Sequence, residues 1–236
     1  MSRTRLLLAA FVLAATADLV SLAAGFGTGH PLAKPLLMPL LAAYAATRGA
    51  PRLLVAALLC GWGGDLLLLS DAEPAFLAGM ASFAAGHVCY LALFRAHGAA
   101  SAAGDARRTA ARARGTHLTP VYAMVLLGTV ALLWPDLPAG LRVPVAGYSL
   151  LLTAMAYAAA TRAGLVAGIG GTLFLLSDTL IATGVADWPQ PPLPDFWVMI
   201  TYIAAQFLLV RGTLAAPSKV VDMSAIDRLR FTSRPG

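Results

Sequence analysis

The sequence has very little charge. Only 12% of its 236 residues are Asp, Glu, Lys or Arg, whereas 59% are hydrophobic. Soluble domains carry roughly 25% charged residues, so a chain of this composition would expose large apolar patches to water. The mean hydropathy of +0.76 supports the same conclusion. The composition therefore excludes a soluble globular domain of any size and indicates a protein that is embedded in lipid.

Cysteine is also scarce, and no residue cluster suggests a metal site or a disulfide. Cys60 and Cys89 both lie in apolar runs without a Cys-x-x-Cys or Cys/His spacing, and we interpret them as small buried residues. A catalytic zinc commonly binds three protein ligands, often His, but only His87 lies clearly inside an apolar run. No Gly-x-Ser-x-Gly motif supports a serine nucleophile. We expect no metal and no cofactor.

Long apolar stretches dominate the rest of the chain. A helix needs roughly 17–25 residues to cross a bilayer, and we predict an all-α, polytopic membrane bundle of about eight transmembrane helices. Their expected ranges are 6–26, 31–47, 53–70, 74–95, 118–134, 141–160, 163–184 and 195–210. Together they form one predicted transmembrane domain, residues 1–214, with a polar loop at 96–116. Residues 215–236 are predicted to form a polar cytoplasmic tail.

The start of the chain, with two Arg residues before an apolar run, also resembles a signal peptide. The apolar run continues past Asp18 to Phe26, which is longer than the usual hydrophobic region of such a peptide. We therefore expect the first helix to be retained.

Basic residues fall almost entirely on one side of the predicted bundle. With the amino terminus inside, fifteen of the 17 Lys and Arg residues lie in inside segments, and Lys34 and Arg142 are the two exceptions. Positive residues favour the cytoplasmic side of a membrane. We therefore predict a multi-pass protein of the cell membrane with both termini in the cytoplasm. This distribution explains the net charge of +6 without a nucleic-acid partner.

A few ionisable side chains interrupt the apolar helices. Asp18, Asp65, His87 and Asp178 lie within predicted spans, and Lys34 lies near an outer end. A charged group at the bilayer centre costs about 2.5–3.5 kcal/mol on insertion scales, so such residues usually serve a function. With a rise of about 1.5 Å per residue, the three Asp lie about 20–24 Å from the inner face. We predict a shared polar cavity entered from the outer leaflet, with plain interhelical hydrogen bonding as the alternative.

The segments around Asp65 and Asp178 are alike. A small residue, Gly64 or Ser177, precedes each Asp, and Leu or Ile follows within three residues. Both helices are predicted to run from inside to outside. This similarity suggests a 4+4 parallel repeat in which the two Asp face each other across the pseudo-axis.

Five motifs occur in order on the predicted helices: Lys34-Pro35-Leu36-Leu37-Met38-Pro39, Gly64-Asp65-Leu66-Leu67-Leu68, Phe76-x-x-Gly79-x-x-x-Phe83-x-x-Gly86-His87-x-x-Tyr90, Gly171-x-x-Phe174-x-x-Ser177-Asp178-x-x-Ile181-Ala182 and Tyr202-x-x-Ala205-Gln206. Together they resemble the YhhN family, which includes the mammalian lysoplasmalogenases. The resemblance extends from the first to the eighth helix and excludes the tail and the Arg-rich loop. Ile181 stands where the family favours a residue such as Leu.

The resemblance implies a hydrolase that cleaves the vinyl ether bond of a lysoplasmalogen or a related lysolipid. The products would be a fatty aldehyde and a glycerophospho-head group. The implied partners are a lysophospholipid substrate and the bilayer, whereas the oligomeric state is not predicted.

Vinyl ether hydrolysis requires acid catalysis. Protonation of the β-carbon gives an oxocarbenium ion, water adds to it, and the hemiacetal collapses to the aldehyde. Paired carboxyl groups serve a related cation in glycoside hydrolysis, and burial favours the neutral form of one of them. We predict Asp65 and Asp178 as the catalytic pair, without assigning the acid, and His87 as a proton relay. The predicted substrate-binding residues are Lys34 (for the lipid phosphate), Asp18, Tyr90, Ser177, Tyr202 and Gln206.

Other classes of function remain open. A transporter of a small molecule or lipid would also place Asp residues inside the membrane, and a repeat would suit it. An ion channel would need a continuous polar file, but the inner half of most helices is apolar. A purely structural or sensory role would leave three buried carboxyl groups unexplained.

Overall fold

The computed structural model describes residues 2–70, 72–101 and 105–215, and it describes the side chains of these residues outside 97–114. Within those ranges all regular secondary structure is helical, and turns connect the helices. They are α1 (Arg3–Ala24), α2 (Gly29–Thr47), α3 (Arg52–Leu67), α4 (Glu73–Ser101), α5 (Asp105–Leu133), α6 (Ala139–Ala158), the π-helical turn η1 (Ala159–Ala163), α7 (Leu165–Val185) and α8 (Pro194–Ala215). The prediction of an all-α bundle is confirmed.

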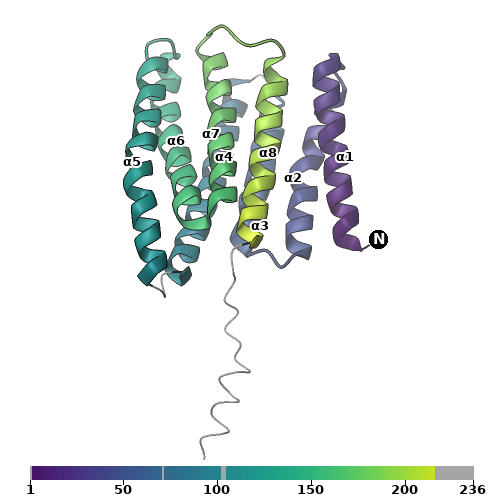
Figure 1. Ribbon diagram of the computed structural model, residues 1–236. Coiled ribbons are helices and arrows are strands. Elements are labelled where there is room, and N and C mark those ends of the chain that lie inside the picture. The colour runs from purple at the N-terminus through teal and green to yellow at the C-terminus, as the bar shows by residue number, and fades with distance from the viewer. Residues whose placement is uncertain (1, 71, 102–104, 216–236) are drawn as a thin grey trace, which may run out of the picture.

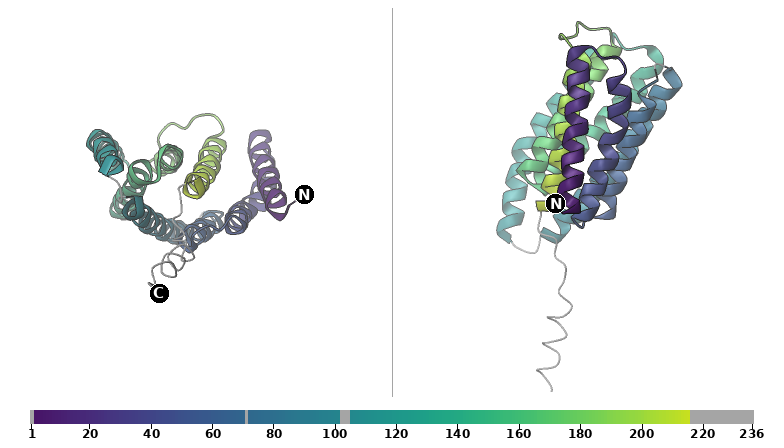
Figure 2. Two further views of the ribbon diagram at one scale, coloured as in Figure 1. Left: turned by 60° about the horizontal axis from the view of Figure 1, so that its bottom comes forward. Right: turned by 90° about the vertical axis from the view of Figure 1, so that its right-hand side faces the viewer.

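The helices lie side by side along one common direction (Figure 1). Six of them form an arc in the order α1, α2, α3, α4, α6 and α5, and α7 and α8 pack together on its concave side (Figure 2). The start of α1 and the end of α8 lie at the same end of the bundle. The arc therefore contains helices from both halves of the chain. Helices α1 to α4 form one part of it, α5 and α6 form the other, and the two parts meet where α4 contacts α6.

Six of the described helices are long and apolar enough to cross a membrane. The exceptions are α2, whose His30 and Lys34 lower its hydropathy, and α3, which has only 16 residues, about 24 Å. Both run alongside the other helices within the arc. The predicted 4+4 repeat stays a prediction.

The loop predicted at 96–116 is wrong for most of its length. Helix α4 continues to Ser101, and α5 begins at Asp105. The segment is rich in Ala and Arg, which are among the best helix formers, so helix continues beyond the apolar run. Helix α8 also extends five residues past the predicted end at 210, to Ala215. The predicted tail, apart from Ala215, lies outside the described residues.

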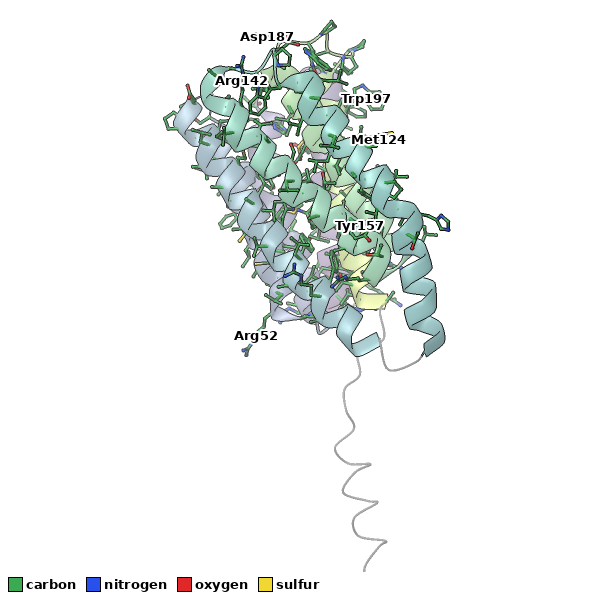
Figure 3. The ribbon with its side chains drawn as sticks, turned by 90° about the vertical axis from the view of Figure 1, so that its left-hand side faces the viewer. Arg52, Met124, Arg142, Tyr157, Asp187 and Trp197 are labelled. Carbon is green, nitrogen blue, oxygen red and sulfur yellow. The ribbon has the colours of Figure 1, made fainter. Side chains whose placement is uncertain are left out.

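The two ends of the bundle differ in charge. Arg52 lies at the end where α1 begins, and Arg142 and Asp187 lie at the opposite end (Figure 3). We call the first of these the basic end, because it also carries Arg162 in η1 and Arg211 near the end of α8.

Small residues allow the central helices to approach closely. A Cβ atom on Gly170 would lie 2.9 Å from the carbonyl oxygen of Ala205, and one on Gly212 would lie 2.6 Å from the backbone nitrogen of Ala167. Such contacts are shorter than van der Waals separation, so only glycine fits at this α7–α8 interface. Small residues commonly bring membrane helices together in this way.

Helix α2 tolerates internal prolines because a neighbouring helix satisfies its backbone. Pro39 lacks the N–H that would bond the carbonyl of Pro35. The indole Nε1 of Trp62, on α3, donates to that carbonyl oxygen at 2.9 Å. This bond fixes α2 against α3 next to Lys34, whose side chain is buried.

Candidate functional site

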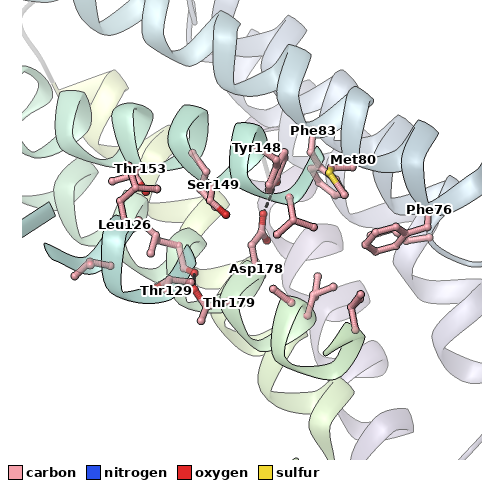
Figure 4. Close-up of a pocket in the computed structure, with 18 residues that line it drawn as sticks. Phe76, Met80, Phe83, Leu126, Thr129, Tyr148, Ser149, Thr153, Asp178 and Thr179 are labelled. Carbon is pink, nitrogen blue, oxygen red and sulfur yellow. Dashed lines mark hydrogen bonds between the residues drawn. The ribbon is translucent and has the colours of Figure 1, made fainter. Parts of the chain in front are cut away.

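A largely apolar cavity of about 740 Å³, including the open space at its mouth, lies between α4, α5, α6 and α7. Its walls carry Leu, Val, Phe and Met side chains, and the polar groups gather around Asp178 (Figure 4). The cavity extends from the end opposite the basic end, where Phe76 and Val185 line it, to Leu152 about halfway along α6. It is thus an apolar chamber within the membrane-spanning part, with one carboxyl group in its wall.

The carboxyl group of Asp178 is held by a tyrosine of the neighbouring helix. The hydroxyl of Tyr148, on α6, donates a short hydrogen bond to Oδ2 of Asp178. The Nε2 atom of His87, on α4, lies 3.0 Å from the oxygen of Tyr148. Three helices therefore contribute one residue each to a hydrogen-bonded chain that ends in the cavity.

The direction of these bonds fixes the tautomer of His87. Because the Tyr148 proton points to Asp178, its oxygen accepts from His87, which must carry hydrogen on Nε2. The buried Nδ1 atom of His87 then needs a donor, and it has none among the described residues. This arrangement orients Tyr148, and it offers no onward partner for the proton relay predicted for His87.

Asp65 belongs to a second chain of the same kind. The hydroxyl of Tyr202, on α8, donates to Oδ2 of Asp65 at 2.9 Å. The amide of Gln206 donates to the Tyr202 oxygen at 3.4 Å, and Tyr90 donates to the amide oxygen of Gln206 at 2.7 Å. The structure thus brings together four residues predicted from the sequence. Gly61 makes room, since a Cβ there would lie 3.2 Å from both Tyr202 Oη and Gln206 Nε2.

Two aromatic rings separate the chains. Phe83 lines the cavity, and its ring packs edge-to-face against Tyr202 and Phe174, with centroids 5.9 and 6.2 Å apart. Phe174 in turn packs edge-to-face on His87 at 4.8 Å. Asp65 is not among the described residues that line the cavity. Asp178 therefore faces the chamber directly, and Asp65 lies behind the aromatic wall.

Asp65 nevertheless interacts electrostatically with residues outside its own hydrogen-bonded chain, including Asp178. Asp65 is buried and interacts electrostatically with Lys34, Asp178 and Asp18. Asp18 is fully buried on α1, and its Oδ1 pairs with Nδ1 of His30 at 2.8 Å. Its Oδ2 has no partner in the part of the chain that the structure describes. Lys34 on α2 and Asp18 on α1 thus act on Asp65 electrostatically from helices that contribute no residue to the described cavity lining.

Hydroxyl groups complete the polar lining. Ser149, on α6, lines the cavity and points its oxygen toward Asp178 (Figure 4). Thr179 also lines it, but its hydroxyl is bonded to the carbonyl oxygen of Leu175 at 2.7 Å. Ser177, predicted to bind substrate, instead donates to the carbonyl oxygen of Val198 at 3.1 Å and faces α8.

Sequence reasoning missed Tyr148, Ser149 and His30. A tyrosine and a serine side by side within an apolar helix are a usable signal, since each needs a hydrogen-bond partner in lipid. Among the described residues, no group of three or more His, Cys, Asp or Glu side chains is placed to hold a metal ion.

A family model described as the YhhN family matches residues 29–213. Lysoplasmalogenase TMEM86B of Homo sapiens is 33% identical over 181 residues, which cover 74% of this chain and 69% of that protein. The protein of the same name from Sus scrofa is 33% identical over 189 residues, 77% of this chain and 72% of its own. That from Rattus norvegicus is 31% identical over 193 residues, 78% and 72% of the two chains. No solved structure matches the chain.

The matched range includes α2 to α8 and therefore both hydrogen-bonded chains. The apolar helices together with these relatives identify a multi-pass membrane protein. On the extent of the family match and the identity to its relatives, the chain belongs to the YhhN family.

Proposed function

We propose that this protein is a membrane-embedded hydrolase that cleaves the vinyl ether bond of a lysoplasmalogen or a related lysolipid. The observation that carries the proposal is a single carboxyl group, Asp178, in the wall of an apolar chamber and oriented by Tyr148. The lysoplasmalogenase names of three relatives support the reaction class. The products are a fatty aldehyde and a glycerophospho-head group.

Asp178 serves as the acid. Tyr148 donates to Oδ2, so that oxygen is the acceptor, and a proton on Oδ1 is free to face the chamber. An apolar, water-poor chamber favours the neutral carboxyl group. Transfer of that proton to the β-carbon of the vinyl ether forms a C–H bond and leaves an oxocarbenium ion beside the new carboxylate.

The cation is stabilised from two directions. The Asp178 carboxylate lies next to it. The rings of Phe83 and Tyr148 line the chamber, and aromatic faces attract cations. Groups fixed before the charge develops stabilise a transition state without reorganising.

Ser149 holds the attacking water. Its hydroxyl points toward Asp178, so a water between the two is placed to lose its proton to the carboxylate (Figure 4). Attack forms the hemiacetal and restores the acid. Asp178 then protonates the ether oxygen, the C–O bond breaks, and the Asp178 carboxylate takes the proton of the hemiacetal hydroxyl, which releases the aldehyde and the glycerol hydroxyl and restores the acid. One water is consumed, and no proton is gained or lost.

We also propose that both termini lie in the cytoplasm. The basic end of the bundle carries Arg52, Arg162 and Arg211, and basic residues favour the cytoplasmic side. The cavity then opens in the outer half of the membrane, and the substrate enters from the outer leaflet. Labelling of single cysteines introduced at Asp187 and Arg52 in intact cells would test this topology. Labelling from outside at position 52 would contradict it.

The direct test of the activity is aldehyde release by the purified protein. We expect aldehyde from a vinyl ether lysolipid and none from a lysolipid with a saturated ether. The Asp178→Asn variant should release aldehyde from the vinyl ether at least about 10²-fold more slowly. Counterflow of lipid or solute in liposomes without any aldehyde would contradict the proposal and favour a transporter.

A further inference from the structure

Hydrogen bonds between described side chains connect α5 and the turn after it to the rest of the bundle. Near the basic end, Tyr122 Oη lies 3.1 Å from Thr172 Oγ1 of α7, and Thr119 Oγ1 lies 3.0 Å from Tyr157 Oη of α6. Just beyond its other end, Asp136 accepts a 2.8 Å hydrogen bond from the indole of Trp188. In the apolar stretch Gly115–Leu133 only 6% of the residues are buried, whereas 50% are buried in the corresponding stretch of α8. The part of α5 between these contacts, residues 123–132, is thus a loosely packed wall without a buried residue.

This wall is open to the lipid. Val125 lines the cavity and is nevertheless 40% exposed. One turn further along α5, a Cβ atom on Gly128 would meet nothing within 4 Å. On α7, Leu175 lines the cavity, whereas its neighbour Leu176 is 46% exposed. The chamber therefore reaches the membrane between α5 and α7.

The two helices are in register along this opening. They run in the same direction, and Tyr122 meets Thr172 at its basic-end limit. Seven residues further along each helix, Thr129 and Thr179 both line the cavity (Figure 4). The stretch from the Tyr122–Thr172 contact to this pair is therefore two helical turns long, about 10 Å. Between its two limits, the aliphatic side chains of Val125, Leu126 and Leu175 line the cavity beside Asp178.

We propose that this opening is a lateral portal that binds the hydrocarbon chain of a single-chain lipid, with Val125 and Leu176 against the chain. The reactive bond then lies at Asp178, the head group lies toward the Phe76 and Val185 end, and the rest of the chain extends into the bilayer. The single carboxyl group in the cavity wall and the apolar lining around it suit one chain with one reactive bond, as in a lysolipid. The identity of the bond cleaved rests on the proposed function, but the chain site does not.

Photolabelling tests the chain site without turnover. The probe is a lysophosphatidylethanolamine with a saturated ether bond and a diazirine in the middle of its chain, added to the purified full-length protein in lipid. We expect the label on peptides that contain residues 122–129 of α5 and 172–179 of α7. Labelling confined to α1, α2 or α8 would overturn the portal, whatever the protein hydrolyses.

Blocking the portal supplies a second test. Val125→Trp and Leu176→Trp should each reduce labelling of the two peptides at least fivefold and raise the KM for a long-chain lysoplasmalogen. The rise in KM should be several times smaller for a short-chain, water-soluble vinyl ether. Met124→Trp is the matched control, because Met124 is 73% exposed and is not among the cavity-lining residues. Equal effects of all three variants, or equal effects on both substrates, would overturn the proposal. Absence of aldehyde from every substrate, with the label still at the portal, would count against the proposed reaction alone.

Discussion

His87 and Tyr90 lie one turn apart on α4, and each begins a hydrogen-bonded chain that ends on a different carboxyl group. His87 reaches Asp178 through Tyr148, and Tyr90 reaches Asp65 through Gln206 and Tyr202. Both carboxyl groups thus accept from a phenol. They differ in surroundings, since the first faces the cavity and the second lies behind Phe83.

This difference predicts unequal effects of the two Asp→Asn variants. Asp178→Asn removes the acid and should lower kcat by at least about 10²-fold. Asp65→Asn keeps an acceptor for Tyr202 and changes a group that does not line the cavity, so its loss of kcat should be about 10-fold. Aldehyde release by the purified variants measures both. A larger loss in Asp65→Asn than in Asp178→Asn would reverse our assignment of the acid.

Tyr148 is predicted to position the acid. Tyr148→Phe removes the donor to Asp178, and misplacement of a catalytic group can cost roughly 10²-fold in rate. The loss should appear in kcat with KM unchanged. Tyr44→Phe, at a buried tyrosine of α2, is the control and should retain activity.

His87 is predicted to act on Asp178 indirectly, through its hydrogen bond to Tyr148. His87→Gln keeps an N–H donor for Tyr148, whereas His87→Leu does not. The Gln variant should therefore retain several times more activity than the Leu variant. Equal activities would show that the imidazole N–H does not orient Tyr148.

Ser149 is predicted to hold the water. Without its hydroxyl, in Ser149→Ala, the oxocarbenium ion should be captured less selectively by water. In buffer that contains methanol, the ratio of methyl acetal to aldehyde should rise above that of the wild type. Thr179→Val is the matched control, because the Thr179 hydroxyl is already bonded to a backbone carbonyl. An unchanged product ratio in Ser149→Ala would remove Ser149 from the mechanism.

The close contact of α7 and α8 predicts a change in stability. Gly212→Val places a side chain 2.6 Å from the backbone of Ala167 and should lower the free energy of unfolding by about 1–3 kcal/mol or more. Gly128→Ala meets open space and should raise it by about 0.4–1 kcal/mol. Thermal unfolding in detergent measures both. Equal destabilisation would mean that α7 and α8 do not pack as described.

Hydropathy and the distribution of Arg were sufficient to predict the helical bundle, because each apolar stretch must satisfy its own backbone in lipid. The spacing of Tyr202 and Gln206, one turn apart, also indicated that they share a face. The structure places both beside Asp65.

Sequence analysis missed some site residues because their position in the site depends on how each helix is rotated about its axis. Tyr148 meets Asp178 only because α6 lies between α4 and α7 in the bundle. No local pattern states which face of α6 is turned inward, since its apolar residues occur on every side. The separation of Asp65 from the cavity depends likewise on one ring, Phe83, which packs into the space that Gly64 leaves open.

The account rests on protonation of the vinyl ether carbon by Asp178, and isotope labelling of the products tests it most directly. Hydrolysis in deuterated water enriched in ¹⁸O, with immediate reduction of the aldehyde to the alcohol, records where each atom is added. We predict one deuterium on the carbon next to the aldehyde carbon, in a single stereochemical configuration, and no ¹⁸O in the glycerol hydroxyl of the head group. Deuterium in both configurations, or ¹⁸O in the glycerol hydroxyl, would show cleavage on the glycerol side and contradict acid catalysis at Asp178.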